Sequence, residues 1–527
     1  MPDIRYIDKD FVRFKFSGFG GREEQAILSF GDKVEVLEEG GGRRPSRVRA
    51  LELFDGTLEG TVAGKPFRGR DKGVLKFSMV DVQQGDGMIL ETPPDENHAT
   101  RLVFIDGGDN KLFARHVAAR YRHRQSSTTH PLEVDLILIT HGDADHFEGL
   151  IDIKRSETER GISDRKRLFI HPRRVYHNGL VKGPVAVPEL ARLGRTVIDN
   201  GTPMIVDLYD DPRHAPDNMQ NGPFKRWGNT LSQWEARGAI TFKRVAHGMN
   251  PDDLFGFLGP AVKMEIQGPF TSQVTEGGDS KDALPFLHNP PKSALLHLEE
   301  GTAPSSDDFS VSHTINGHSI AFRLTYGNVR FNFTGDLNQE SMALMRERID
   351  LDELEAEVVK APHHGSADFD FKALKAMRPV VSLISSGDES ADKEHIHPRA
   401  TLVSALGKVS RGETGIVLCT ELAAFFAKRD HSHERLRIAK FYEGDEVITR
   451  ADLRRFYSAE PRSRKDEEAL PSFFGFERTN FGIIHIRTDG ERVLVFTHSG
   501  KEGMREAYRF TVDANHTIRF ARDVTTG

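Results

Sequence analysis

The chain has 527 residues, of which 29% are charged, and a formal net charge of −7 at pH 7. This length exceeds one ordinary core, so we expect two or three domains. The mildly acidic charge excludes binding of nucleic acid through bulk electrostatics alone, so such binding would need local basic patches. Residues 115–124 and 166–174 form two basic stretches, and ordinary solvated charge explains them equally well.

The cysteine and hydropathy patterns bear on the compartment. Cys419 is the single cysteine and lies in an apolar, strand-like run, which excludes an internal disulfide framework and indicates a buried thiol. No apolar run approaches the ~18 residues of a membrane span, and the first residues lack a secretory apolar region. We therefore expect a cytoplasmic protein without a membrane partner.

Residues 1–75 alternate apolar and polar side chains in short runs that are separated by turn signals. Gly40–Gly42 and the pair Asp55-Gly56 are typical of such turns. The pattern predicts a small β-barrel and resembles bacterial SH3-like barrels. Its expected role is docking or substrate positioning, with a purely structural cap as the alternative.

The next two segments, residues 75–93 and 100–110, are expected to pair as neighbouring strands. Glycines at the ends of these segments permit the tight backbone turns that bring Asp86 and Asp106 close to a site.

Residues 134–150, VDLILITHGDADHFEGL, carry the densest set of polar groups. An aliphatic run typical of a buried strand is followed within six positions by His141, Asp143, Asp145 and His146. Imidazoles and carboxylates together suit zinc or manganese. Two such ions about 3.5–4 Å apart can activate a water and stabilise both the attacking and the leaving oxygen. The alternative is a solvated turn in which these side chains cap a helix.

Two later segments add further candidates. Asp336 ends an aromatic-rich strand, where it is either a metal ligand or the cap of the helix that begins near residue 338. The adjacent histidines His363 and His364 end another strand, so one of them is expected to face the site, and the sequence leaves open which. Lys360, Ser366 and His397 are expected to contact an anionic group.

Four segments together, residues 79–110, 134–150, 330–337 and 358–366, resemble the metal-binding motifs of metallo-β-lactamase-fold hydrolases. The His-x-Asp-x-Asp-His order is similar to the ComEC-type competence-protein branch, and the resemblance covers about residues 77–406. It implies an αββα sandwich that holds two divalent ions. In that scheme His141 and Asp143 hold one ion, Asp145, His146 and His363 or His364 hold the other, and Asp336 bridges. Asp143 replaces a histidine of the lactamases, which favours manganese alongside zinc.

The chain departs from the family pattern at three points. Gln83 stands where the family commonly has glycine, so Asp86 and Asp106 are assigned a supporting role and not that of ligands. The expected histidine before Asp336 is absent, and Ile396 replaces the glycine that usually precedes the position of His397. Asn316 and Ser319 occupy the neighbourhood of the absent histidine, with three weaker substitutes in His247, His313 and His318.

The predicted organisation is a barrel at 1–75, a hydrolase domain at 76–409 with an insertion at about 181–310, and a β-rich C-terminal module at 410–527. In the insertion, residues 187–199 and 227–238 have helical periodicity, and residues 277–308 form a loop that is either a lid or a linker.

The predicted function is a two-metal phosphodiesterase or nuclease that acts on DNA or RNA, with Asp145, Asp336, Lys360 and His397 in the catalytic site. The alternatives are a hydrolase of a small phosphoester or other ester, and a weakly catalytic metal-binding interaction module. A protein partner or a second copy of the chain would bind the N- or C-terminal module.

Overall fold

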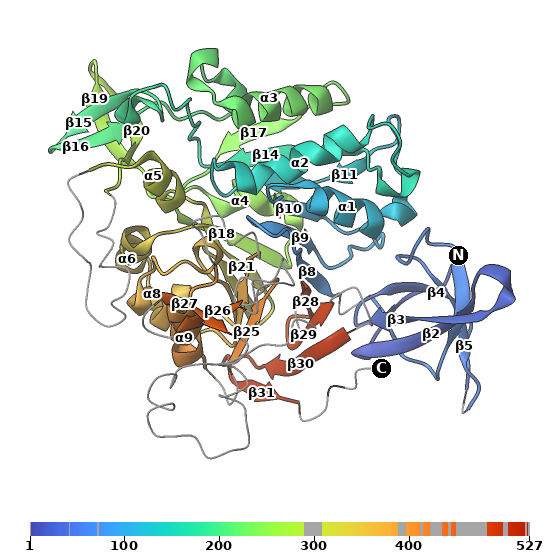
Figure 1. The fold of residues 1–527 in the computed structure, drawn as a ribbon. Coiled ribbons are helices and arrows are strands. Elements are labelled where there is room, and N and C mark those ends of the chain that lie inside the picture. Colours follow the sequence, from blue (N-terminus) through green and yellow to red (C-terminus); the bar gives the residue numbers. More distant parts are fainter. Residues whose placement is uncertain are drawn as a thin grey trace.

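The computed structural model describes residues 2–41, 43–70, 73–288, 308–387, 397–411, 415–421, 435–440, 444–449, 482–498, 504–521 and 524. Two large sheets pack face to face, and helices cover their outer faces (Figure 1). This mixed α/β architecture has the four layers of the predicted αββα sandwich and is consistent with a metallo-β-lactamase-like fold. No helix in the described part of the chain is both long and apolar enough to cross a membrane.

The first sheet has ten strands in the order β17-β14-β12-β10-β9-β8-β28-β29-β30-β31. Its members are β8 (Leu75–Met79), β9 (Gly87–Glu91), β10 (Leu102–Asp106), β12 (Leu136–Leu138), β14 (Arg174–His177), β17 (Thr241–Arg244), β28 (Ile483–Thr488), β29 (Arg492–His498), β30 (Met504–Val512) and β31 (Ile518–Phe520). Strands β10, β12, β14 and β17 are parallel. Their carboxyl ends therefore meet at one edge of the sheet.

The second sheet has six strands in the order β18-β21-β22-β23-β24-β25. They are β18 (Val262–Gly268), β21 (Ala321–Tyr326), β22 (Val329–Phe333), β23 (Val358–Lys360), β24 (Val381–Ile384) and β25 (Ile416–Cys419). Aromatic side chains join the two sheets across the central core, where the rings of Phe77 and Phe333 lie 5.4 Å apart. Burial of this apolar face holds the sheets in the register that brings their loops together.

Helices cover both outer faces because each has one apolar stripe. The first sheet is covered by α1 (Lys111–Arg120), α2 (Ala144–Ser156) and α3 (Gly222–Glu235). The second is covered by α6 (Gln339–Arg348), α7 (Leu351–Leu354), α8 (Phe371–Met377) and α9 (Ala400–Val409). Cys419 is buried in this second outer layer, as its apolar surroundings in the sequence predict.

The N-terminal unit is an antiparallel sheet in the order β3-β2-β6-β5-β4-β1-β7, which curls around its own apolar core. Its strands are β1 (Ile4–Ile7), β2 (Phe11–Ser17), β3 (Glu23–Ser29), β4 (Lys33–Glu38), β5 (Ser46–Ala50), β6 (Leu58–Val62) and β7 (Phe67–Arg68). The short antiparallel strands agree with the sequence pattern, and the SH3-like class of this unit stays a prediction.

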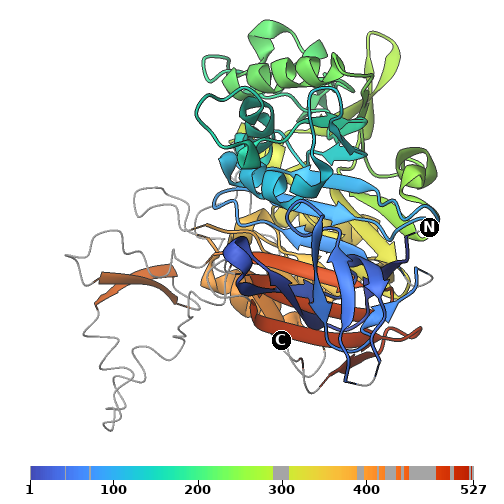
Figure 2. The ribbon, with the colours of Figure 1, turned by 90° about the vertical axis from the view of Figure 1, so that its right-hand side faces the viewer.

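The C-terminal strands β28–β31 do not form a module of their own. Strand β28 pairs with β8, so β28–β31 complete the first sheet of the hydrolase domain. The boundary predicted at residue 410 therefore cuts through one continuous structure, because strand pairing between such distant parts of the chain leaves no local signal in the sequence. The N-terminal unit packs on these strands through Phe30 and Phe496, with an ion pair between Asp32 and Arg487 (Figure 2).

The insertion contains α3, as predicted for residues 227–238, but no helix at 187–199. That stretch holds a short 3-10 turn and β15 (Thr196–Asp199), which pairs with β16 (Thr202–Ile205). The predicted loop begins later than expected, because β19 (Ser272–Glu276) and β20 (Asp279–Pro285) form a hairpin. Residues 289–307 of that loop lie outside the described part of the chain. The remaining elements are α4 (Pro251–Phe255), α5 (Val311–Gly317), β11 (Leu132–Val134), β13 (Ile170–Pro172) and the hairpin of β26 (Arg435–Lys440) and β27 (Gly444–Thr449).

Candidate metal centre

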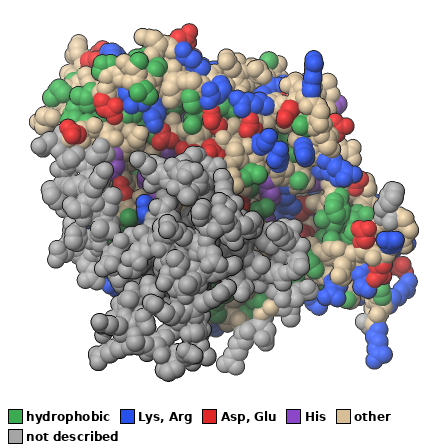
Figure 3. Space-filling model, in the orientation of Figure 1, with side chains coloured by type: hydrophobic (Ala, Val, Ile, Leu, Met, Phe, Trp, Pro, Cys, Tyr) green, Lys and Arg blue, Asp and Glu red, His purple; other side chains and the backbone are tan. Residues whose placement is uncertain are grey.

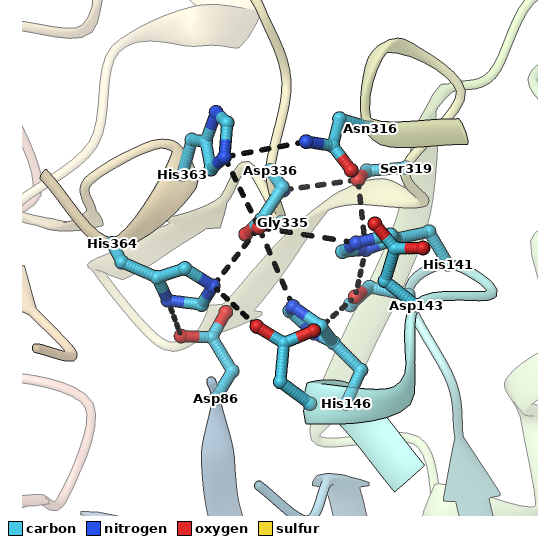
Figure 4. A network of polar contacts seen from close by, with 12 residues as sticks. Asp86, His141, Asp143, His146, Asn316, Ser319, Gly335, Asp336, His363 and His364 are labelled. Carbon is cyan, nitrogen blue, oxygen red and sulfur yellow. Dashed lines mark hydrogen bonds and ion pairs between the residues drawn. The ribbon is translucent and has the colours of Figure 1, made fainter. Parts of the chain in front are cut away.

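The centre lies where the loops of the two sheets meet. Strand β12 ends just before His141, and α2 begins at Ala144, so the turn between them places His141 and His146 side by side (Figure 4). Their ring centroids are 3.9 Å apart. A side chain at Gly142 would meet the ring of Phe224 at 2.9 Å, so only glycine fits this turn as it is packed.

Asp336, from the loop that follows β22, is the common neighbour of the histidines. Its Oδ2 atom lies 2.9 Å from Nε2 of His364, 3.4 Å from Nε2 of His146 and 3.8 Å from Nε2 of His141. The backbone N–H of Asp336 donates a hydrogen bond to Oγ of Ser319 (2.9 Å), which holds the loop in place. Four histidine and aspartate side chains from different elements therefore converge on one buried point.

The donor set fits a divalent metal ion. The Nε2 atoms of His141, His146 and His364 are buried and lack a partner with hydrogen-bond geometry in the described structure. A buried polar atom without a partner costs free energy, and a ligated metal ion removes that cost. Ligand atoms within 4.8 Å of one another form the sets His141, His146, Asp336 and Asp145, His146, His364. Their mixture of nitrogen and oxygen suits zinc or manganese.

The other ring nitrogens, Nδ1 of His146 and Nδ1 of His364, each lie beside a carboxylate. Nδ1 of His146 lies 2.9 Å from Oδ2 of Asp106, and Thr140 donates two further hydrogen bonds to the same carboxylate. Nδ1 of His364 lies 3.3 Å from Oδ1 of Asp86. Contacts of this kind fix the orientation of a metal-ligating ring. They agree with the supporting role predicted for Asp86 and Asp106.

The structure distinguishes the two adjacent histidines that the sequence left open. Nε2 of His364 points at Asp336 and lies 3.7 Å from Oδ2 of Asp145. His363 is farther away, at 4.0 Å from Asp336, and its Nε2 contacts the side-chain amide of Asn316. Both residues have positive φ, at 45° and 50°, which is uncommon for non-glycine residues and is concentrated at functional sites. His364 therefore lies among the converging candidate ligands, and His363 lines the more exposed side.

Asp143 stands apart from the other predicted ligands. Its Oδ1 accepts a hydrogen bond from Nζ of Lys182, and it belongs to none of the described sets of converging ligand atoms. Asp145 faces the site and accepts a hydrogen bond from the amide of Gln84 (3.2 Å). Neither Lys182 nor Gln84 is predicted from the sequence: Lys182 belongs to no motif, and Gln84, although it lies in the first motif segment, reaches Asp145 only through the fold.

Lys360 does not have the predicted contact with substrate. Its side chain is fully buried beneath the cluster, where Nζ pairs with Asp86, donates to the carbonyl oxygen of Gly335 (2.8 Å) and lies 3.6 Å from Oδ1 of Asp336. A group without exposed surface cannot touch a substrate, and the contacts of Lys360 are with residues that support the cluster. His397 lies beside His363, with ring centroids 5.8 Å apart, and its substrate contact stays a prediction.

The three substitutes for the absent histidine all point elsewhere. Nε2 of His318 bonds the carbonyl of Pro285, and Nδ1 of His247 bonds that of Ile266. His313 faces Glu340 and Asp368. Asn316 and Ser319, in contrast, lie at the centre, where Oγ of Ser319 is 3.2 Å from Nδ1 of His141.

The buried charges shift one another's pKa values. Burial alone would lower the pKa of His364, but the carboxylates of Asp336 and Asp86 raise it to about 10. Burial opposes a charged His146 in the same way, yet Asp336 and Asp106 hold its pKa well above the ordinary value. His141 has a pKa well below the ordinary value because of burial and the nearby charge of His146. Asp336, although buried, has a strongly lowered pKa beside His364 and His146. In the metal-free protein, His146 and His364 are therefore protonated beside the ionised Asp336, and their positive charge compensates this carboxylate as a metal ion would.

No model of a protein family matches the chain, and a search of curated proteins finds no match either. Among solved structures, the chain is similar to Tm1679, a metal-dependent hydrolase of the beta-lactamase superfamily, at 11% identity and a TM-score of 0.28, over 66% of this chain and 95% of that one. It is also similar to a diphosphatase of the PhnP family (10% identity, TM-score 0.21, 59% and 86% covered) and to a mutant of the CmlA beta-hydroxylase (11%, 0.24, 61% and 47%). Because these identities and TM-scores are low, the chemistry is inferred from this chain's own residues.

Proposed function

We propose that the protein is a metal-dependent hydrolase that cleaves phosphodiester bonds of DNA or RNA. The observation that carries the proposal is the convergence of three buried histidine nitrogens on Asp336 at the loop edge of an αββα sandwich. A divalent ion held there by Asp145, His146, His364 and Asp336 would supply a Lewis acid and a water of lowered pKa. Zinc and manganese both suit these ligands.

The chain's own residues would position the reacting groups. Asp106 and Thr140 hold the ring of His146, and Asp86 holds that of His364, so the ligand atoms are placed before substrate arrives. His363 is the most accessible histidine of the centre, with 26% of its side chain exposed. It is placed to donate a hydrogen bond to a phosphate oxygen of the substrate.

A basic groove supports a polynucleotide substrate. Arg115 and Lys166, one from each basic stretch of the sequence, line a common groove of about 580 Å³ with Lys111 and Arg155. Arg115, Lys111 and Lys166 form no ion pair with any residue that the structure describes, so they are available to phosphates. The groove also contains Asp109, Asp152 and Glu159. Lysine and arginine side chains gather on the face that carries α1 and α2 (Figure 3).

Other basic side chains of these stretches are already engaged. Arg120 pairs with Glu91, Arg173 pairs with Glu133, and the guanidinium of Arg174 lies 4.0 Å from the ring centre of Phe257. Among the lysines and arginines of these stretches and their groove, the proposal therefore assigns phosphate contacts to Lys111, Arg115 and Lys166.

The direct test is cleavage of labelled single- and double-stranded DNA and RNA, and of a small chromogenic phosphodiester, by metal-free protein reloaded with zinc or manganese. Asp336→Ala should lose both bound metal and cleavage. Metal-loaded protein that cleaves none of these substrates would contradict the proposal. Cleavage of the small diester alone would point to the small-ester alternative.

A charge-reversal pair tests the groove. Arg115→Glu with Lys166→Glu should reduce cleavage of a polynucleotide and flatten its salt dependence, because each lost phosphate contact removes released counterions. Cleavage of the small diester should stay unchanged. Lys225→Glu with Lys263→Glu, at two exposed positions on α3 and β18, is the matched control. Equal losses on both substrates would remove the groove from the proposal.

A further inference from the structure

We propose that Lys182 replaces the second metal ion, so that the centre binds one divalent ion tightly, through Asp145, His146, His364 and Asp336. This inference rests on the metal binding of the proposed function and concerns the number of ions. The sequence motif instead predicts a second ion position, formed by Asp143 and His141. Only the fold brings Lys182 to that position.

The charge of Asp143 is already compensated within the protein. This carboxylate is the anionic ligand that a second ion would need in addition to the shared Asp336. In the structure it is paired with the ammonium of Lys182, with 21% and 16% of the two side chains exposed. Because the pair is largely shielded from water, the ammonium already neutralises Asp143.

Lys182 is anchored by its backbone and by its neighbours in the chain. Its carbonyl oxygen accepts a hydrogen bond from the backbone N–H of Asn221 (2.9 Å), and the N–H of Gly183 bonds the carbonyl of Arg192 (2.7 Å). Its other neighbour, Val181, is buried in the core beneath α2 and α3. The backbone on both sides of Lys182 is therefore fixed, and the ammonium is directed at Asp143 by the fold.

The two ion positions differ in the ligands that they offer. The position proposed for the bound ion has two imidazoles and two carboxylates. Among the described residues and without Asp143, the other position has His141 and the neutral side chain of Asn316 besides the shared Asp336, while Nε2 of His363 is engaged by the Asn316 amide. His247, His313 and His318 point elsewhere, so this position has one carboxylate where the first has two. The amide oxygen of Asn316 is buried without a hydrogen-bond partner, which is consistent with a weak additional ligand. Fewer and less charged ligands hold a cation less tightly.

The ammonium of Lys182 would also repel a second metal ion directly. A metal ion bound to Asp143 would lie about 2 Å from a carboxylate oxygen. An ammonium that is hydrogen-bonded to the same carboxylate would then be about 4–5 Å from the ion, where like charges in a poorly solvated site repel strongly. A second ion at this position would first have to displace Lys182.

The test is metal stoichiometry, which does not depend on any substrate. Wild-type protein is stripped of metal, titrated with manganese and zinc, and examined by native mass spectrometry and calorimetry. The expected result is one tight ion, with any second ion at least ~100-fold weaker. Lys182→Met keeps most of the length of the side chain and removes its charge, so the second ion should bind about tenfold tighter or more.

The controls isolate Lys182 and Asp143. Lys154→Met removes a lysine with the same 16% side-chain exposure on α2 and should leave the stoichiometry at one ion. Adding Asp143→Asn to Lys182→Met should abolish the gain, because the freed carboxylate is lost again. Electron paramagnetic resonance of the manganese form gives an independent measure, since paired ions couple and a single ion does not.

Two results would overturn the inference. One is a wild-type protein that binds two ions with similar affinity. The other is a Lys182→Met protein, folded by circular dichroism, that binds no second ion more tightly than wild type does. Absence of phosphodiester cleavage would contradict the proposed function but would leave the stoichiometry, and hence this inference, untouched.

Discussion

Oδ2 of Asp106 lies 2.9 Å from Nδ1 of His146, and both side chains are fully buried. The carboxylate fixes Nδ1 as the donor of this ring, because a carboxylate only accepts hydrogen bonds. When the ring is neutral, as metal ligation requires, Nε2 carries the free lone pair, and it faces Asp336. Asp106 also holds Oγ1 of Thr140 (2.7 Å), which lies 3.2 Å from Nδ1 of His141.

We expect Asp106→Asn to lower the affinity for the metal by about 10–100-fold while the fold is retained. The amide has the shape of the carboxylate but lacks its charge and can present a donor to the ring, which weakens His146 as a ligand. Competition with a metal-sensing dye measures the affinity. Asp152→Asn, at a partly exposed position on α2, is the control, and equal affinities of both variants and wild type would contradict the role of Asp106.

Lys360 and Asp86 form a buried ion pair beneath the centre, and both side chains are fully buried. Burial opposes both charges, but the attraction of Asp86 raises the pKa of Lys360 and that of Lys360 lowers the pKa of Asp86. Lys360→Met should therefore reduce the free energy of unfolding of the metal-free protein by about 3–5 kcal/mol, since it leaves the buried charge of Asp86 uncompensated.

The double variant Lys360→Met with Asp86→Asn provides the check on this pair. It should recover part of the loss in urea unfolding, because the second change removes the stranded charge. Strictly additive losses would show that the two residues do not act as a pair.

Metal binding should release protons near neutral pH. In the metal-free protein the raised pKa of His364, about 10, and the raised pKa of His146 keep both rings protonated, whereas ligation requires the neutral form. The affinity should therefore rise with pH across the neutral range. Calorimetry in buffers with different ionisation enthalpies counts the protons, and a heat of binding that is independent of the buffer would contradict the prediction.

A second pH effect concerns stability away from the centre. Burial would raise the pKa of Glu91, but Arg120, which is its ion-pair partner, and Lys76 lower it to about 2. Since this pKa is below the unfolded value of 4.5, the ionised carboxylate stabilises the fold above about pH 4.5, and that contribution is lost as the pH falls toward 2.

Glu91→Gln removes this titration. Its stability in urea should fall less steeply than that of wild type when the pH is lowered below 4.5, the unfolded pKa of the carboxyl, even if the variant is less stable at neutral pH. Glu96→Gln, at an exposed position, should keep the wild-type slope. Parallel slopes for Glu91→Gln and wild type would contradict the prediction.

The metal-site residues that follow strands could be recognised from the sequence. His141, Asp145 and His146 come directly after an aliphatic run, and Asp336 comes directly after an aromatic one. Alternation and run length are local properties, so they indicate where a buried strand ends and where polar side chains gather. The αββα layers followed from the resemblance carried by these same segments.

Only the tertiary structure decided how these residues are used. It selected His364 over His363, buried Lys360 under the centre, paired Asp143 with Lys182 and joined β28 to β8. The physical reason is that each of these contacts joins parts of the chain whose proximity is determined by packing of the whole core. Local propensity gives no information about which distant groups such packing brings within reach of one another.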